Sequence, residues 1–263
     1  MIKLELSFIQ LLKSFILRNE LIGKYYSRKY GNSKLSLDYI LEKILFILKT
    51  GISWRYIHSH WETIYWHFRR FITNHIFSDL FHFLRNKYIK LIKPSIQLID
   101  TTFILNKLGH SCIARNKLFK NKNCNKISAI TDVNGIPLSV LFNSGNVHDL
   151  SFLNGHFSDL IIVNKKYIHT NIKLLADKGY TSYSKKLLSK KFNYNLIVPP
   201  KSNMKQQKFY YKKLYKKRIF VEHFFQKLKL FRRIMIRYDK LISSFETFTF
   251  MATSFIIFRK LNQ

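Results

Sequence analysis

Acidic residues are scarce in this chain of 263 residues, which has only 14 Asp and Glu against 46 Lys and Arg. The formal net charge is therefore +32. A protein this basic repels itself unless a polyanion neutralises it, so the charge favours nucleic acid as a partner. An AT-rich coding sequence is another source of lysine, because it also enriches Ile, Asn, Phe and Tyr. Codon bias does not by itself deplete the acids to 14, so nucleic acid is the stronger interpretation.

Cysteines and long apolar runs are also scarce. Only two cysteines occur, Cys112 and Cys124, and their spacing matches no standard zinc motif, so we expect two reduced thiols inside a cell. The apolar runs at 6–12 and 245–258 are shorter than the roughly 20 residues that cross a bilayer. The chain is therefore predicted to be cytoplasmic, associated with DNA and without a membrane partner, and both runs are predicted to form buried helices.

Apolar side chains are plentiful, at 47% of the chain with 24 Phe and 15 Tyr, which is enough for a packed core. Up to about residue 90 they recur at helical spacing, first over 37–48, where Ser36 can cap the helix and Gly51 can end it. A second helical stretch is expected from Trp61 to Leu84. This region can be a DNA-binding helix-turn-helix or a helical cap on a larger domain, and the sequence leaves both open.

The pattern changes near Pro94, after which short apolar runs predict strands. Two of these runs flank the Asn134-Gly135 pair, which is typical of a β-hairpin. A further strand is expected at 196–198. The helices expected in this half lie at 181–191, 215–233 and 245–261. Strands followed by helices predict an α/β fold, with a mixed sheet flanked by helices.

Two carboxylates end apolar, strand-like runs in this half of the chain, Asp100 and Asp177. A carboxylate at the end of a buried strand is costly to desolvate unless a cation neutralises it. That cation can be a Lys or Arg side chain, or a hard metal ion such as Mg²⁺.

A third carboxylate, Glu222, lies on a predicted helix within a polar stripe about 60° wide, at about 100° per residue. The four residues of this stripe are Tyr215, Arg218, Glu222 and Lys229. Such a stripe can be a ladder of salt bridges on a helix surface. It can also hold a metal ligand beside two cations that bind phosphate.

The spacing Tyr-x2-Arg-x3-Glu-x6-Lys of these four residues resembles the signature of a large branch of bacterial insertion-sequence DDE transposases. Other segments resemble the same branch in the same order, over roughly residues 35–260. They include Lys49-Thr50-Gly51-Ile52-Ser53-Trp54-Arg55, Ile99-Asp100-Thr101-Thr102, Ala176-Asp177-Lys178-Gly179-Tyr180 and Phe231-Arg232-Arg233. The chain also keeps Gly145, His148 and Asp149, whereas Ser128 stands where many relatives have His.

The resemblance implies an RNase H-like catalytic domain at residues 93–263, preceded by a small helical region at residues 1–92. It also implies that Asp100, Asp177 and Glu222 are the catalytic and metal-binding residues. Two divalent ions are expected, Mg²⁺ with Mn²⁺ able to substitute.

The activity implied by the resemblance is binding of the ends of an insertion element, followed by metal-dependent DNA cleavage and strand transfer. The partners would be element ends and target DNA, with a homodimer assembled on DNA. The expected DNA-binding residues are Tyr215, Arg218, Lys229, Lys178, Arg232 and Arg233. Two alternatives stay open, an RNase H-like nuclease that does not join strands and a catalytically inactive, element-derived DNA-binding protein.

Overall fold

The structure is a computed structural model that describes residues 2–27, 35–57, 60–168, 171–182, 188–200 and 212–263. The chain forms two compact units. The first comprises Met1–Leu84, Leu108–Ser111 and Leu228–Gln263, and the second comprises Arg85–Lys107 and Cys112–Lys227. The division expected from the sequence, between a helical region and a catalytic domain at residue 92, stays a prediction.

The first unit is built mainly of helices. They are α1 (Ile2–Leu17), α2 (Gly23–Ser27), α3 (Leu37–Thr50), η1 (Trp54–Tyr56), α4 (Trp61–Thr73), the first half of α5 (Ile76–Ile92), α10 (Arg232–Met235) and α11 (Ile242–Leu261), with the short strand β7 (Ile236–Arg237). The predicted helical stretch 61–84 is therefore two helices. They are separated at Asn74 and His75, and His75 has a positive φ of 55° that an α-helix cannot contain.

Helix α3 begins and ends where the sequence predicts. The Ser36 side chain accepts a hydrogen bond from the Tyr39 N–H at 3.2 Å. Gly51 adopts the left-handed conformation, with φ 72°, and its N–H donates to the Ile47 carbonyl at 2.9 Å. A side chain at Gly51 would be strained by this φ and would also press on Arg232, with a Cβ 3.2 Å from the Arg232 Cβ.

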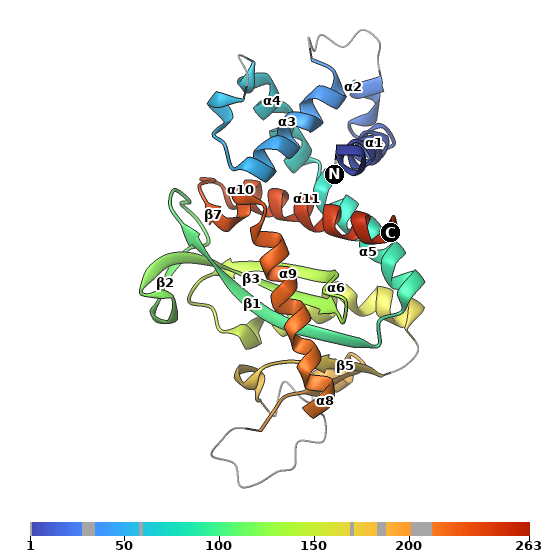
Figure 1. Ribbon diagram of the computed structural model, residues 1–263, viewed down its shortest axis with the longest axis vertical. Coiled ribbons are helices and arrows are strands. Elements are labelled where there is room, and N and C mark those ends of the chain that lie inside the picture. The colour runs from blue at the N-terminus through green and yellow to red at the C-terminus, as the bar shows by residue number, and fades with distance from the viewer. Residues whose placement is uncertain (1, 28–34, 58–59, 169–170, 183–187, 201–211) are drawn as a thin grey trace. The chain divides into compact units, whose positions relative to one another are not determined.

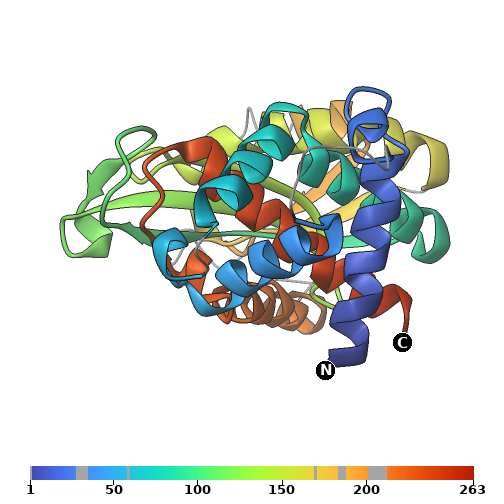
Figure 2. The same cartoon turned by 90° about the horizontal axis from the view of Figure 1, so that it is seen from above.

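The core of the first unit lies where α1 packs against α3 and α11, and where α11 packs against α4 (Figure 2). Its contacts are largely aromatic. Phe68 stacks on Phe248 with ring centroids 4.6 Å apart, and Phe8 meets Phe255 edge to face at 5.1 Å. Both predicted apolar runs thus form helices. The run 245–258 is largely buried, whereas the run 6–12 buries only one face and leaves Leu6 49% exposed. Among the described residues, none of the helices combines the length and the apolar character needed to cross a bilayer.

The second unit contains a mixed sheet. Its strands are β1 (Ile96–Asn106), β2 (Ala114–Asn116), β3 (Lys122–Asp132), β4 (Pro137–Ser144), β5 (Ile172–Leu175) and β6 (Tyr194–Ile197). Its helices are the second half of α5, η2 (Lys117–Phe119), η3 (Asp149–Ser151), α6 (Phe152–Tyr167), η4 (Lys178–Tyr180), α8 (Lys212–Tyr215), η5 (Lys216–Arg218) and most of α9 (Ile219–Lys229).

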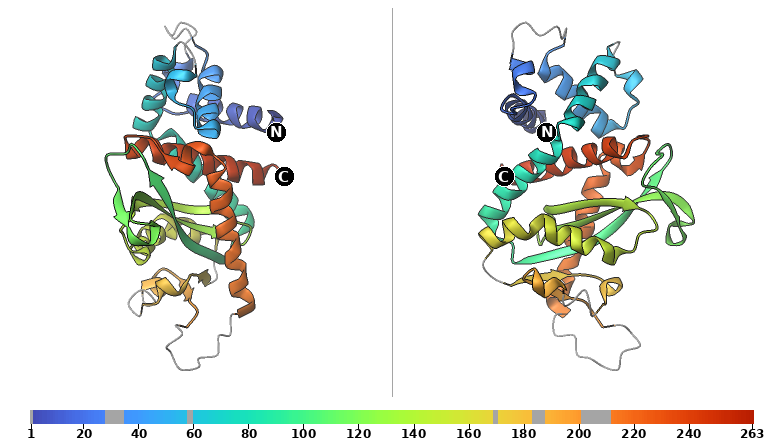
Figure 3. Two further views of the ribbon diagram at one scale, coloured as in Figure 1. Left: turned by 60° about the vertical axis from the view of Figure 1, so that its left-hand side comes forward. Right: turned by 180° about the vertical axis from the view of Figure 1, so that it is seen from behind.

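The strand order is β2-β3-β1-β5-β6, with β4 also paired to β3. Strands β4, β3 and β1 are antiparallel neighbours, whereas β5 and β6 run parallel to β1. Helix α9 crosses one face of this sheet and α6 covers the other (Figures 1 and 3). A mixed sheet of this order with helices on both faces is the RNase H-like arrangement, so the predicted fold class is confirmed.

The predicted hairpin is confirmed as β3 and β4, which turn at Asn134 and Gly135. Two other expectations were wrong in detail. Strand β1 does not end at Asp100, because its pairing with β3 continues as far as Leu105. The helix expected over 215–233 is interrupted by the 3-10 turn η5 and again after Lys229. Of the helix expected over 181–191, the structure describes a helical end at 188–191, and residues 183–187 lie outside the described residues.

Candidate active site

The pairing of β1 with β5 places two of the predicted acids side by side. The strands run parallel, and Leu98 of β1 pairs with Leu175 of β5. Asp100 and Asp177 each follow that pair by the same number of residues, and neighbouring strands lie about 4.8 Å apart. The two carboxylates therefore come from neighbouring positions, Asp100 within β1 and Asp177 just after the carboxyl end of β5.

The Asp100 carboxylate is largely buried and is held by one arginine. Arg218 Nη2 donates to Oδ2 at 2.8 Å, and the Thr101 N–H donates to Oδ1 at 2.9 Å. Burial is the largest influence and raises the pKa of Asp100 above its ordinary value, although Arg218 and the Thr101 N–H lower it. The carboxylates of Asp177 and Glu222 raise this pKa further, so all three predicted acids act on the same group.

Asp177 leads from β5 into the 3-10 turn η4. Its Oδ1 accepts a hydrogen bond from the Gly179 N–H at 2.7 Å, which caps the turn. The side chain is half-buried, and Ala176 before it is fully buried. The cap fixes the carboxylate beside Asp100, and among the described residues no donor is bonded to its other oxygen, Oδ2.

Glu222 lies in the first turn of α9, and its side chain is exposed. Its carboxylate forms no ion pair with any described residue. Arg218, which precedes it by one helical turn, pairs with Asp100 instead. The salt-bridge ladder that the helical spacing also allowed is therefore not formed between these two residues. The Glu222 carboxylate is instead close enough to raise the pKa of Asp100.

Arg218 joins the helix to the strand. Besides Asp100, its guanidinium donates from Nη1 to the Tyr215 hydroxyl at 3.2 Å. Its Nε is buried and has no hydrogen-bond partner among the described residues. A buried donor without a partner is costly, so this group is suited to an incoming acceptor such as a phosphate oxygen.

The carboxylates of Asp100, Asp177 and Glu222 are suitable ligands for a hard divalent cation, although they do not form a complete metal-binding site by themselves. Within the described part of the chain, no group of three or more His, Cys, Asp or Glu side chains is close enough to hold a metal ion. Mg²⁺ is usually bound by one or two carboxylates plus substrate phosphates, so a complete protein cage is not required. Burial, and to a smaller extent the carboxylates of Asp177 and Glu222, raise the pKa of Asp100. A cation bound at this carboxylate would offset both effects, so the residues present fit such a cation.

The expected DNA-binding residues fall into three groups by exposure. Lys178 and Arg232 are exposed, and Tyr215, Arg218 and Lys229 are half-buried. Burial lowers the pKa of Lys229. Arg233, by contrast, is buried in the first unit, where it pairs with Asp239 at 2.6 Å and lies over the Phe248 ring.

Sequence reasoning did not include Ser128 and His156 in the site, and they form a buried polar connection behind it. Ser128 Oγ lies 2.8 Å from His156 Nε2, and His156 Nδ1 lies 2.8 Å from Ser139 Oγ. Ser139 donates to Asp159 at 2.5 Å. Because a carboxylate only accepts, Ser139 accepts from His156 Nδ1–H, and Ser128 donates to Nε2. Burial lowers the pKa of His156 to about 3, so the ring is neutral.

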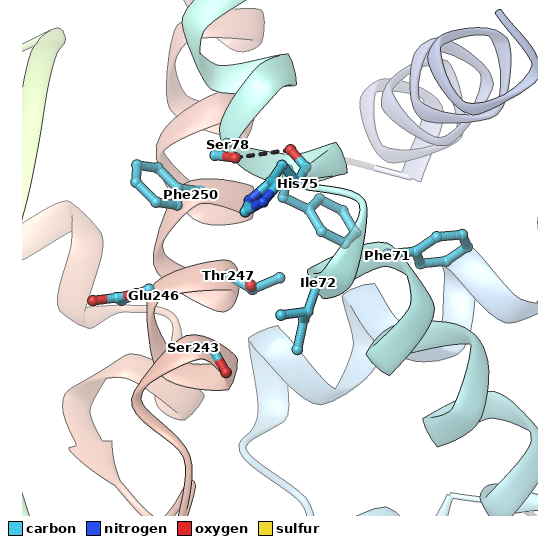
Figure 4. A pocket seen from close by; sticks show the side chains of 9 residues that line it. Phe71, Ile72, His75, Ser78, Ser243, Glu246, Thr247 and Phe250 are labelled. Atoms are coloured by element: carbon cyan, nitrogen blue, oxygen red, sulfur yellow. Dashed lines mark hydrogen bonds between the residues drawn. The ribbon is translucent and has the colours of Figure 1, made fainter. Parts of the chain in front are cut away.

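A pocket of about 120 Å³ lies in the first unit, between residues 71–78 and α11 (Figure 4). Phe71, Ile72, Thr247 and Phe250 give it apolar walls, and Glu246 contributes a carboxylate whose pKa is raised by burial. None of the three predicted acids lines this pocket. Its chemistry is therefore separate from that of the candidate active site.

Comparisons with known proteins add one finding. A family model described as "Transposase DDE domain" matches residues 91–257, a span that includes Asp100, Asp177 and Glu222. The searches of curated proteins and of solved structures gave no match.

Proposed function

Because the chain belongs to the family of DDE transposases, we propose that it binds the ends of an insertion element and catalyses metal-dependent DNA cleavage and strand transfer. The observation that carries this proposal is geometric: the parallel register of β1 and β5 places Asp177 next to Asp100, and Arg218, one helical turn before Glu222, pairs with Asp100. The Tyr-x2-Arg-x3-Glu-x6-Lys spacing of Tyr215, Arg218, Glu222 and Lys229 supports placing the chain in the insertion-sequence branch that carries this signature.

Asp100, Asp177 and Glu222 would hold two Mg²⁺ ions, with Mn²⁺ able to substitute. All three carboxylates would supply oxygen ligands, Asp100 from β1, Asp177 from the turn after β5 and Glu222 from α9. The ions would activate a water or a terminal 3′-hydroxyl as nucleophile and stabilise the leaving oxygen. The protein itself would position Asp100 on β1 beside Asp177, which follows β5, and positioning of this kind accounts for much of the rate of an in-line displacement.

Arg218 would exchange its present contact for a phosphate. It now neutralises Asp100 through Nη2, and its Nε is buried without a partner among the described residues. A cation bound at Asp100 would replace that neutralisation and release the guanidinium for the DNA backbone. Tyr215, hydrogen-bonded to the same guanidinium, would move with it.

The remaining DNA contacts would come from exposed cations. Lys178 follows Asp177 directly, and Arg232 lies in the first turn of α10. Lys229 would contribute from α9, whereas the buried Arg233 supports the local fold through Asp239. The charge of +32 supports binding that is driven largely by counterion release. The proposed assembly is a homodimer on two element ends, with 1–92 as the helical DNA-binding region and 93–263 as the catalytic domain.

The direct test is a strand-transfer assay with Mg²⁺, a duplex that carries an element end, and a target plasmid. Asp100→Asn, Asp177→Asn and Glu222→Gln should each abolish joined products and leave duplex binding intact. Glu42→Gln, which removes an exposed carboxylate from α3, is the matched control and should retain joining. Wild-type cleavage without joined products would favour the nuclease, and end binding with no turnover would favour the inactive DNA-binding protein.

Salt dependence tests the proposed role of the positive charge. The logarithm of the binding constant should fall steeply and linearly with the logarithm of salt concentration, by about 0.9 for each phosphate neutralised. Lys178→Gln and Arg232→Gln should each reduce that slope by roughly 1. A flat response of the wild type would instead attribute the lysine content to codon bias.

A further inference from the structure

A fourth carboxylate, Asp149, is tied to the candidate active site although it is not one of the three predicted acids. Its Oδ1 accepts from the Thr101 hydroxyl at 3.1 Å and from Lys126 Nζ at 2.8 Å. Thr101 is the residue after Asp100 on β1, and Lys126 lies on the adjacent strand β3. Asp149 therefore connects both strands at the level of the first acid.

Because Asp149 is paired with Lys126, its carboxylate has a structural role and is not readily available to bind a metal ion. Lys126 is buried, with 6% of its side chain exposed against 30% for Asp149. It also donates to the Val147 carbonyl at 2.7 Å, which fixes its ammonium group in place. A buried ammonium group needs its partner carboxylate, so Lys126 and Thr101 together hold Asp149 in one position.

The residues that precede Asp149 explain how the chain reaches this position. A side chain at Gly145 would collide with Cys124 Sγ and with backbone carbonyls, so only glycine allows the close approach. His148 Nδ1 then accepts from the Leu150 N–H at 3.2 Å and caps η3, the turn that begins with Asp149. Gly145 and His148 thus together position the Asp149 carboxylate beside Thr101 and Lys126.

On its other side, Asp149 reaches the turn that follows the second acid. Turn η3 packs against η4, and Asp177 caps η4. Tyr180, at the end of η4, is fully buried, and its hydroxyl lies close to Ser128 but makes no hydrogen bond of normal geometry with a described residue. Three carboxylates raise the pKa of this hydroxyl, Asp149 more than Asp100 or Asp177, although burial is the largest cause. Ser128 lowers the pKa of this hydroxyl as a hydrogen-bonding neighbour, and a hydrogen bond to Asp149 Oδ2 would in addition tie η4 to the carboxylate that holds Thr101.

We propose that Asp149 is a positioning residue that fixes the separation of Asp100 and Asp177, through Thr101 on β1 and through Tyr180 on η4. This inference rests on the proposed function, because the separation of the two acids matters when they share cations. Residues that orient metal ligands from outside typically contribute about 10–100-fold to metal affinity. A comparable effect is expected here, although Asp149 would not touch the metal or the DNA.

The test measures Mn²⁺ binding to the full-length protein without DNA, from the electron paramagnetic resonance signal of free Mn²⁺. Asp149→Asn should weaken binding by about 10–100-fold. Thr101→Val should weaken it in the same direction while leaving every charge in place, so its effect comes from position. Thr101→Ser, which keeps the hydroxyl, should restore binding close to that of the wild type, and Tyr180→Phe should weaken it to an intermediate degree.

Asp159→Asn is the matched control, because Asp159 is also a partly exposed carboxylate paired with a buried cation, Arg85, in the same unit. It should lose stability in urea without a change in Mn²⁺ affinity. The double variant Thr101→Val/Asp149→Asn should bind Mn²⁺ no more weakly than Asp149→Asn, because both changes break one connection. If the two losses of Mn²⁺ affinity added up in the double variant, Thr101 and Asp149 would not act through the same contact.

The outcomes separate this inference from the proposed function. If the wild type binds Mn²⁺, Asp100→Asn abolishes binding and Thr101→Val binds like the wild type, the positioning role is wrong and the proposed metal site stands. If Asp100→Asn also binds like the wild type, the proposed metal site is wrong and the inference falls with it. Asp149→Asn breaks the ion pair with Lys126, and this can cause misfolding. Thr101→Val leaves that ion pair intact, so its Mn²⁺ affinity still tests the positioning role.

Discussion

Two arginine–aspartate pairs, one in each unit, differ in how completely they are satisfied. In the first unit, Arg233 donates to both oxygens of Asp239 at 2.6 and 3.1 Å, and less than a tenth of either side chain is exposed. In the second unit, Arg218 donates to a single oxygen of Asp100, and the two side chains are 15% and 21% exposed.

The Arg233–Asp239 pair therefore has the properties of a structural ion pair that stabilises the fold. The Arg218–Asp100 pair has those of a binding site whose groups can exchange partners. A buried bidentate pair leaves no donor or acceptor for a ligand, and breaking it strands a charge. The Arg218 pair leaves Nε without a described partner and leaves the pKa of Asp100 above its ordinary value. Sequence alone ranks Arg218 and Arg233 alike, because both match family motifs.

The largest expected effect is on stability. Arg233→Leu strands the buried Asp239 carboxylate and should reduce the free energy of unfolding by about 3–5 kcal/mol. Arg218→Leu should reduce it by only about 1–2 kcal/mol, because Asp100 is partly exposed and its raised pKa allows it to take up a proton. Urea denaturation at neutral pH measures both. Equal losses would remove the distinction between the two pairs.

A second effect compares the buried histidines of the two units. Burial lowers the pKa of His67 to about 4 and that of His156 to about 3. Between these values and about 6.5 the unfolded chain binds more protons, so stability is lost as the pH falls, by about 2–3 kcal/mol per histidine between pH 6.5 and 4.5.

His156→Gln and His67→Gln should each flatten the dependence of unfolding free energy on pH over that window, whatever their effect at pH 7. Urea titrations at several pH values give this slope. The additional fall between about pH 4 and 3 should belong to His156 alone, because the pKa of His67 is already passed there. A slope unchanged in either variant would show that the histidine takes up its proton as readily in the folded protein as in the unfolded chain.

The smallest effect is a gain in stability at the candidate active site. The pKa of Asp100 is raised in the folded protein, so the folded state binds the proton more tightly than the unfolded state. Ionisation of Asp100 therefore lowers stability as the pH rises through and above its unfolded pKa, and this loss is absent below it. Each unit of pKa shift is worth about 1.4 kcal/mol.

Asp100→Asn should accordingly be more stable than the wild type at pH 7, and the two proteins should converge in acid below the unfolded pKa. Asp239→Asn should be less stable than the wild type at pH 7. Thermal melts of the three proteins across this pH range provide the measurement. A gain in stability for Asp100→Asn and a loss for Asp239→Asn would support the distinction between the two ion pairs. A loss of stability in both variants would contradict it.

The sequence predicted those parts of the fold that depend on local pattern. Ser36 and Gly51 mark the ends of α3 because capping and a positive φ are local requirements. The Asn134-Gly135 pair predicts the turn between β3 and β4 for the same reason. The RNase H-like sheet and the choice of the three acids followed from the resemblance. The register of β1 and β5 then brings Asp100 and Asp177 to neighbouring positions on adjacent segments.

Other features depend on residues far apart in the chain and could not be predicted from local spacing. Arg218 sits one helical turn before Glu222, yet it pairs with Asp100 on β1 because η5 and α9 cross the sheet there. The continuation of β1 beyond Asp100 is fixed by its pairing with β3. Asp149 was visible as one of few acids, but its contact with Thr101 arises only when η3 folds back on the sheet.

The central claim is that Asp100, Asp177 and Glu222 bind divalent cations together, and iron-directed cleavage of the protein tests it most directly. Fe²⁺ bound in place of Mg²⁺, with ascorbate and peroxide, releases radicals that cut the nearest backbone. The account predicts cuts close to residues 100, 177 and 222, all suppressed by excess Mg²⁺ and all lost in Asp100→Asn. Cuts at other positions, or cuts that persist in Asp100→Asn, would contradict it.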